Sequence, residues 1–145
     1  MISLIQRVDS AHVEVDAETI GAIGPGLLAL VAVQPHDDEE APARMLARLL
    51  QYRLFGDEQG RMNRSLPDVG GGLLLVPQFT LAADTRSGLR PSFSMAAAPE
   101  LGRLRFAALE AQARAAHDPV AAGRFGAEMR VHLVNHGPVT FWLEV

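Results

Sequence analysis

The chain contains no cysteine, no lysine and no long apolar run. The absence of cysteine excludes disulfide bonds, thiolate nucleophiles and cysteine-based metal sites. No segment approaches the roughly 20 apolar residues that a helix needs to cross a bilayer. Residues 1–7 also lack the basic flank and apolar stretch of a signal peptide. We therefore expect a soluble, cytoplasmic protein without a membrane partner.

The composition is typical of a folded protein, with 48% hydrophobic and 21% charged residues among 145. This length fits one domain, 1–145. The net charge of −4 disfavours a broad nucleic-acid interface, because phosphate binding relies on basic surface. All thirteen basic residues are arginines, and four flank the most unusual part of the chain: Arg61, Arg64, Arg86 and Arg90. Such a rim suits contact with an RNA end, although genomic composition also explains arginine in place of lysine.

The first third of the chain has the pattern of antiparallel strands. Val13 and Val15 alternate with polar residues, which is the period-2 pattern of a half-buried strand. Gly24-Pro25-Gly26 predicts a turn between strands at 18–23 and 27–33. The second of these is continuously apolar, so we expect it to be buried on both faces.

Two segments have helical periodicity. The first follows the acidic residues 37–40, which suit a helix N-terminus, and should end near residue 54. Its apolar stripe consists of Met45, Leu46, Leu49 and Leu50. The second helix is predicted at 99–116. Its apolar stripe is expected to consist of Leu101, Leu104 and Ala108.

Strands also account for most of the second half. A buried strand is predicted at 73–76, and an irregular segment at 83–98 has the length of a functional loop. Two C-terminal strands, at 127–133 and 139–145, show strong alternation. Two main helices among many strands, without a regular β–α–β rhythm, predict an α+β fold in which mixed β-sheets are layered with the helices.

Several common site chemistries are excluded. The chain has no P-loop, HExxH pair, GxSxG elbow or dinucleotide-binding glycine pattern, and Gly70-Gly71-Gly72 is best explained as a strand-entry turn. The histidines have no ligand spacing, and His132 alternates with core positions beside Arg130, which favours the surface or an interface. The five are His12, His36, His117, His132 and His136. We expect no cofactor and no metal.

Two segments are physically unusual. Pro77-Gln78-Phe79-Thr80-Leu81 follows a buried strand, which the proline must bend or end because it lacks an N–H. Backbone N–H groups freed there suit an oxyanion hole, although a plain bulge with polar side chains toward solvent explains the residues as well. Asn135 to Thr140 is rich in turn residues and predicts a hairpin turn between the C-terminal strands.

These segments carry a resemblance that runs nearly the whole length of the chain. The order and spacing of its pieces resemble the D-aminoacyl-tRNA deacylase family. Besides Pro77–Leu81 and Asn135–Thr140, the pieces include Ile5-Gln6-Arg7-Val8, Met62-Asn63-Arg64-Ser65, Ala83-Asp84-Thr85-Arg86, Arg90-Pro91-Ser92-Phe93 and Gly123-Arg124-Phe125-Gly126.

The resemblance implies a homodimer with active sites at the subunit interface. Gly137-Pro138 would have a cis bond, enter the partner's site and present carbonyl groups to the substrate's α-amino group. A rigid backbone there excludes an L side chain, so chirality is sensed by exclusion. The implied reaction is hydrolysis of the ester of D-aminoacyl-tRNAs and of glycyl-tRNA(Ala), with L-aminoacyl-tRNAs rejected.

The resemblance also implies roles for further residues. Backbone N–H groups near Gln78 and Phe79 would stabilise the oxyanion, and Thr80 would support the reaction as a hydrogen-bonding group. Arg7 would brace the Gly-Pro loop. The same loop motif includes Asn135 and Thr140 as supporting residues. The arginines expected to contact tRNA are Arg86 and Arg90.

One departure keeps alternatives open. The family usually has serine where this chain has Pro77, and a sister branch that edits L-alanyl-tRNA(Thr) also has proline there. That branch typically lacks the phenylalanine found here as Phe79, so D-specificity is the preferred reading. A nucleic-acid-binding dimer without catalysis is the alternative outside enzymes.

Overall fold

The computed structural model describes residues 1–86 and 88–145. Its strands are β1 (Ile2–Val15), β2 (Glu18–Ile23), β3 (Gly26–Ala32), β4 (Phe55–Gly56), β5 (Met62–Arg64), β6 (Gly72–Pro77), β7 (Val120–Ala122) and β8 (Arg130–Glu144). Its helices are α1 (Ala41–Gln51), α2 (Leu66–Val69), the 3₁₀ helix η1 (Phe79–Ala82) and α3 (Pro99–Ala116). The irregular segment predicted at 83–98 lies between η1 and α3, and its residue 87 falls outside the described residues.

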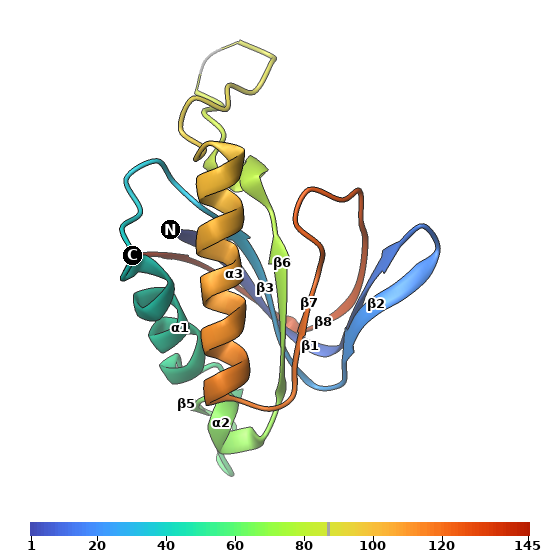
Figure 1. Cartoon of the computed structure of the whole chain (residues 1–145). Coiled ribbons are helices and arrows are strands. Elements are labelled where there is room, and N and C mark those ends of the chain that lie inside the picture. Colours follow the sequence, from blue (N-terminus) through green and yellow to red (C-terminus); the bar gives the residue numbers. More distant parts are fainter. Residues whose placement is uncertain (87) are drawn as a thin grey trace.

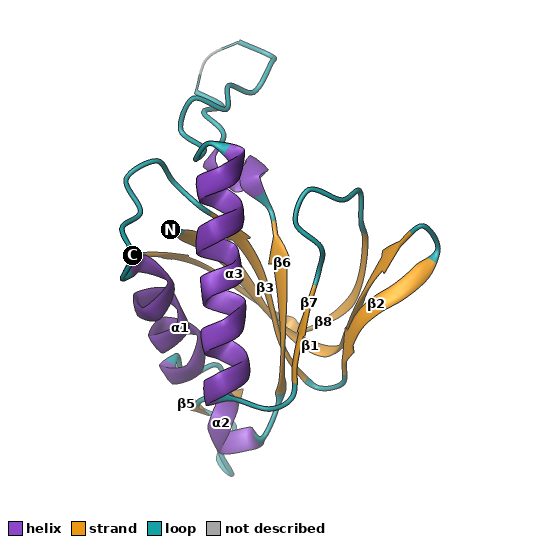
Figure 2. Cartoon of the chain, viewed as in Figure 1, coloured by secondary structure: helices purple, strands orange, loops and turns teal. Residues whose placement is uncertain are grey.

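A mixed six-stranded sheet forms the centre of the fold. The long strand β1 pairs antiparallel with β2, β3 and β8, whereas β3 pairs parallel with β6, and β6 parallel with β7. Helices α1 and α3 lie side by side over one face of this sheet (Figures 1 and 2). The predicted α+β fold with a mixed sheet and two main helices is therefore confirmed.

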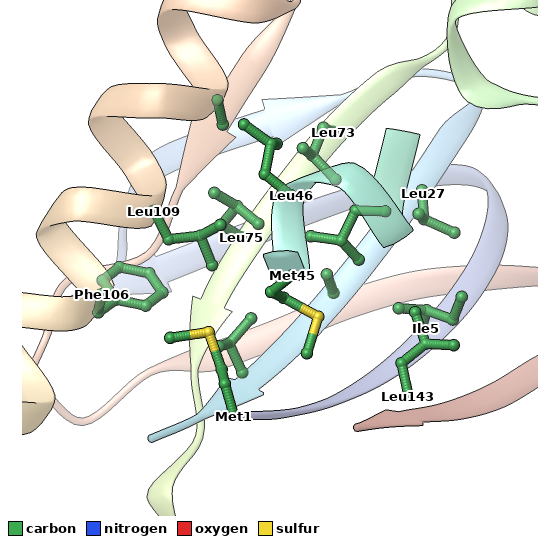
Figure 3. Close-up of a cluster of buried hydrophobic side chains, with 14 of the residues drawn as sticks. Met1, Ile5, Leu27, Met45, Leu46, Leu73, Leu75, Phe106, Leu109 and Leu143 are labelled. Atoms are coloured by element: carbon green, nitrogen blue, oxygen red, sulfur yellow. The ribbon is translucent and has the colours of Figure 1, made fainter. Parts of the chain in front are cut away.

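The main hydrophobic core lies between these helices and the sheet (Figure 3). Leu27 of β3, Leu73 of β6, Met45 of α1 and Leu109 of α3 are all fully buried there. Leu28 of β3 belongs to a second cluster, so β3 is buried on both faces as its sequence predicts. Burial of each such side chain stabilises the fold by about 1.5–3 kcal/mol.

Two glycines allow β3 and β6 to start side by side. Gly26 and Gly72 are register partners, and a Cβ on Gly26 would lie 2.0 Å from the carbonyl oxygen of Gly72. Only glycine permits this approach. The strand-entry turn predicted at 70–72 is confirmed, since α2 ends at Gly70 in a left-handed conformation and β6 begins at Gly72.

The first predicted helix agrees with the observed α1 at its start and differs at its end. Helix α1 begins at Ala41, with Pro42 in its first turn, and ends at Gln51 instead of residue 54. Asp37 does not cap it, because its carboxylate is buried and accepts the Gln34 N–H at 2.7 Å. None of the helices in the described part of the chain combines the length and apolar character needed to cross a bilayer.

Helix α3 has the predicted bounds but a different buried face. Its buried residues are Gly102, Phe106, Leu109 and Ala113. The predicted stripe was wrong, because Leu104 is 60% exposed. Both the predicted and the observed stripe repeat at helical spacing. The observed stripe, which contains the large side chain of Phe106, faces the core.

The C-terminus forms one strand instead of two joined by a hairpin turn. Strand β8 follows β1 antiparallel from the pair Ile2–Glu144 to the pair Glu14–Arg130. The predicted turn is wrong: residues 136–139 form a bulge within β8, opposite the single residue Arg7 of β1. The predicted alternation is confirmed from Val139 to Glu144, where buried or half-buried residues alternate with exposed ones, but not in the first half of the strand, where Leu133 is exposed.

Candidate active site

The chain breaks at the end of β6, as the proline predicts. Pro77 is the last residue of β6 and pairs with Val31 of β3. The N–H of Gln78 donates to the carbonyl oxygen of Val31 at 2.7 Å, and the chain then turns into η1. The break therefore lies at the end of the buried part of the sheet, where a hydrogen bond to β3 fixes the backbone at Gln78.

This break leaves two backbone N–H groups at the start of η1. The N–H of Leu81 donates to the carbonyl oxygen of Gln78 at 3.2 Å, and that of Ala83 to Thr80 at 3.1 Å. The first N–H groups of a helix have no carbonyl partner within it, and in η1 these belong to Phe79 and Thr80. Since the Gln78 N–H is engaged with β3, the available pair lies one residue later than the sequence predicts.

The side chains beside this break form one wall of a pocket. Phe79 is 56% exposed, and its ring lies 5.1 Å from that of Phe93, centroid to centroid. A pocket of about 300 Å³ is lined by Gln78, Phe79 and residues of the segment 125–131. Neither Phe93 nor this segment was predicted to belong to the site, although both lie within or beside the motif pieces that carry the family resemblance.

The Thr80 hydroxyl is held by a neutral group. The side-chain amide of Gln78 donates a hydrogen bond to the Thr80 hydroxyl. An amide does not take up a proton at neutral pH, so this contact orients the hydroxyl without activating it as a nucleophile.

The second predicted segment is the bulge of β8. His136, Gly137 and Pro138 are exposed, and the Gly137–Pro138 peptide bond is cis. Arg7 donates to the carbonyl oxygen of His136 at 3.2 Å and to that of Leu54 at 2.7 Å. The guanidinium thus ties the exposed bulge to the segment after α1.

Polar side chains close the base of the bulge. The Asn135 amide donates to the carbonyl oxygens of Val139 at 3.2 Å and Arg7 at 3.4 Å. The Thr140 hydroxyl accepts from the amides of Gln6 at 3.3 Å and Asn135 at 3.4 Å. These hydrogen bonds connect the two ends of the bulge, which form its neck.

Glycine is required at the tip of the bulge. Gly137 has φ of +129°, which L side chains rarely adopt. A Cβ there would lie 2.7 Å from Cγ2 of Val139 and 3.1 Å from Nη2 of Arg7. Gly137, which lets the bulge form, therefore also packs against Arg7, which holds the bulge in place.

The two segments are not neighbours within the sheet of one chain. Between β8 and β6 lie β1 and β3, so three strand spacings separate them. At the usual spacing this is roughly 14 Å across the sheet. Gln78, Phe79 and Thr80 therefore gather at one place, and Gly137, Pro138, Arg7, Asn135 and Thr140 at another.

The loop between η1 and α3 carries the arginines predicted to contact RNA. Asp84 and Ser92 form a β-bridge at the base of this loop. Arg86 binds Asp84 through Nε at 2.9 Å and Nη2 at 2.7 Å, which lowers the pKa of Asp84 far below its usual range. Arg90 is exposed. Arg86 thus fixes the base of the loop and already has a carboxylate partner.

Comparisons with known sequences identify the family. A family model described as D-Tyr-tRNA(Tyr) deacylase matches residues 4–144. A D-aminoacyl-tRNA deacylase from Thioalkalivibrio sulfidiphilus is 66% identical over 145 residues, which cover 100% of this chain and 97% of that protein. One from Azotobacter vinelandii is 67% identical over 144 residues, or 99% of each chain.

Two solved structures share the fold of this chain. The c-Myc DNA Unwinding Element Binding Protein superposes with a TM-score of 0.94 at 35% identity, covering 100% of this chain and 99% of the other. A probable eukaryotic D-amino acid tRNA deacylase superposes with a TM-score of 0.81 at 18% identity, covering 99% and 98%, and supports the fold alone. The chain belongs to the D-Tyr-tRNA(Tyr) deacylase family.

Proposed function

We propose that this protein hydrolyses the ester of D-aminoacyl-tRNAs, and of glycyl-tRNA(Ala), as a homodimer that rejects L-aminoacyl-tRNAs. The observation that carries the proposal is the exposed bulge at Gly137-Pro138, braced by Arg7 and separated from Phe79 and Thr80 by two strands. Each protomer would lend its bulge to the pocket of its partner.

The chemistry would take place at the break after β6. A water molecule attacks the ester carbonyl carbon, and the N–H groups of Phe79 and Thr80 stabilise the tetrahedral oxyanion. Collapse of this intermediate breaks the bond to the ribose oxygen, which takes up a proton from the attacking water and leaves as the hydroxyl of the tRNA, while the amino acid leaves as its carboxylate. Losing one such donor costs about 2.7–4 kcal/mol in the barrier. Thr80 supports this site as a hydrogen-bonding group, and the ribose 2′-hydroxyl of the substrate assists the attack.

The chirality of the substrate's amino acid would be sensed by the backbone of the partner's Gly137-Pro138 segment. The carbonyl groups of the partner's Gly137-Pro138 bind the α-amino group, and the rigid chain beside the α-carbon excludes an L side chain. A D side chain points toward solvent, so many D-amino acids are accepted. Glycine is accepted as well, because it has no side chain to exclude.

Exposed apolar side chains on β8 support a dimer interface there. Val134 is 55% and Trp142 50% exposed, and both belong to the strand that carries the bulge. Pairing through this strand would bury these side chains and bring the bulge to a second chain at the same time.

Two other functions are outcomes of the same test. Pro77 favours editing of L-alanyl-tRNA(Thr), whereas Phe79 favours the D-specific site. The name of the c-Myc DNA Unwinding Element Binding Protein suggests a DNA-binding dimer, which the net charge of −4 disfavours here.

The deciding experiment follows ester loss from tRNAs charged with D-tyrosine, L-tyrosine, L-alanine and glycine. Rapid loss from D-Tyr-tRNA and glycyl-tRNA(Ala), with L-Tyr-tRNA spared, is the expected result. Preferential hydrolysis of L-Ala-tRNA(Thr) would replace the proposal with L-alanine editing. Loss of none of the esters would reject a deacylase and leave nucleic-acid binding.

A further inference from the structure

Two histidines and a glutamate form a cluster on the pair β1–β8. His12 of β1 and His132 of β8 are direct register partners, and Glu14 lies two residues after His12 on the same face of β1. All three side chains are partly accessible to solvent. The sequence does not reveal this cluster, because 120 positions separate His12 from His132 and only the strand register brings them together.

The potential ligand atoms of the three side chains lie close together. The two imidazole rings stack at 4.2 Å between centroids and 5° between planes. Glu14 Oε1 lies 3.6 Å from His12 Nε2, and Glu14 Oε2 lies 3.3 Å from His132 Nε2. All three ligand atoms lie within 4.8 Å of one another. In a tetrahedral zinc site, bonds of about 2.0–2.2 Å place ligand atoms roughly 3.3 Å apart, and each imidazole points a ring nitrogen at the ion, so the two stacked rings must rotate out of their parallel arrangement to bind it.

The kinds of ligand atom in this cluster favour one class of metal ion. Two imidazole nitrogens and one carboxylate oxygen suit Zn²⁺ and neighbouring transition metals, whereas Mg²⁺ and Ca²⁺ prefer oxygen ligands alone. A surface hollow of about 410 Å³ is lined by His12 and His132. Glu14 does not line this hollow, but its side chain and those of both histidines are partly exposed, so water can reach the cluster as a fourth ligand.

We infer that His12, Glu14 and His132 bind a divalent transition-metal ion of the Zn²⁺ class. The ion joins β1 to β8 three residues before Asn135, the residue at the neck of the Gly137-Pro138 bulge. Its effect is to stabilise this strand pair, because a ligand that binds only the folded chain raises its stability. Protons compete with the metal for the imidazoles, so the affinity falls as the pH is lowered.

The test is isothermal titration calorimetry of the metal-stripped protein with ZnCl₂, together with thermal unfolding with and without zinc. One zinc ion per chain and a rise in Tm that EDTA reverses are expected. His132→Ala and His12→Ala should each weaken zinc binding about 100-fold or more and abolish the rise in Tm, since even the loss of a group that only hydrogen-bonds to a metal ligand costs about 10–100-fold. Glu14→Gln should weaken binding as well.

His36→Ala is the matched control, because His36 is an exposed histidine away from the cluster. It should bind zinc like the wild type, and MgCl₂ should give no binding to either protein. The inference is overturned if the double variant His12→Ala/His132→Ala, folded by circular dichroism, binds zinc as tightly as the wild type, or if the wild type binds none. No tRNA is used, so the outcome is independent of the proposed deacylase activity.

Discussion

The guanidinium of Arg7 donates a hydrogen bond from Nε to the carbonyl oxygen of His136 at 3.2 Å. Arg7 is the one residue of β1 that lies opposite the bulge of β8. A second bond, from Nη1 to the carbonyl oxygen of Leu54 at 2.7 Å, anchors the same side chain to the segment after α1. A planar, permanently charged fork suits this double contact, which a lysine ammonium does not reproduce. Arg7 thus positions the Gly137-Pro138 segment without belonging to it.

Replacing Arg7 should damage both stability and hydrolysis. Arg7→Ala removes two hydrogen bonds from a charged donor and should lower the free energy of unfolding by about 1.5–3 kcal/mol. Arg7→Lys keeps the charge but should still lose most D-Tyr-tRNA hydrolysis. Urea denaturation and single-turnover deacylation measure the two effects. Arg44→Ala, which breaks an exposed ion pair with Asp38, is the control and should change little. An Arg7→Ala protein with full activity would show that the brace is not needed.

Gly137→Ala should deform the bulge. The added Cβ meets Val139 and Arg7, and φ of +129° costs about 1–3 kcal/mol for a residue other than glycine. D-Tyr-tRNA hydrolysis should fall about tenfold or more while circular dichroism shows a folded chain. Gly24→Ala is the matched control, because a Cβ there has nothing within 4 Å. Equal rates for the two variants would argue against a defined backbone at position 137.

The parts of the fold that follow local rules were predictable. Strand β2, the double burial of β3 and the bounds of α3 follow from periodicity, glycine and proline alone. The start of α1 directly after the acidic residues was predictable as well, but its end at Gln51 was not. The role of Asp37 was not predictable either, because its buried carboxylate accepts the Gln34 N–H, which depends on tertiary packing.

Non-local pairing accounts for the other errors. Asn135, Gly137 and Pro138 are turn residues, but β1 extends past them on both sides, so the chain forms a bulge where a turn was expected. The shift of the free N–H pair to Phe79 and Thr80 depends on the Gln78 bond to β3. Local composition marked the two segments as unusual and the family resemblance proposed them as the site, whereas strand register determined their geometry.

Thr80→Ala should retain substantial activity. The Thr80 hydroxyl accepts from the Gln78 amide and has no base in that contact, so the variant loses an orienting bond but no nucleophile. Single-turnover hydrolysis of D-Tyr-tRNA should fall by about tenfold or less. Thr80→Ser, which keeps the hydroxyl, is the control. Complete inactivity of a folded Thr80→Ala protein, together with an active Thr80→Ser protein, would instead assign Thr80 as the nucleophile.

Three surface carboxylates should make the free energy of unfolding depend on pH in acid. Their contribution should be constant near neutral pH and should fall as the pH is lowered. Hydrogen bonds from Ser65 lower the pKa of Asp68, and hydrogen bonds from Asn63 and from Arg86 lower those of Asp57 and Asp84. A lowered folded-state pKa gives stability that is present above the ordinary value of 3.8 and is lost as pH falls through the folded value. Urea denaturation from pH 7 to pH 3 measures this loss. Asp68→Asn should flatten the acid limb, and an unchanged slope would contradict the assignment.

Complementation between two inactive variants tests the shared active site most directly. One protomer carries Phe79→Pro, which removes one of the two proposed oxyanion N–H donors at the first position of η1, the other carries Gly137→Ala together with Pro138→Ala, and separate affinity tags isolate the heterodimer. If each bulge enters the partner's pocket, one site of the heterodimer is wild type on both sides. The heterodimer should then hydrolyse D-Tyr-tRNA at about half the wild-type rate and spare L-Tyr-tRNA, while both homodimers are inactive. A heterodimer as inactive as its parents would place pocket and bulge in the same protomer and contradict the account.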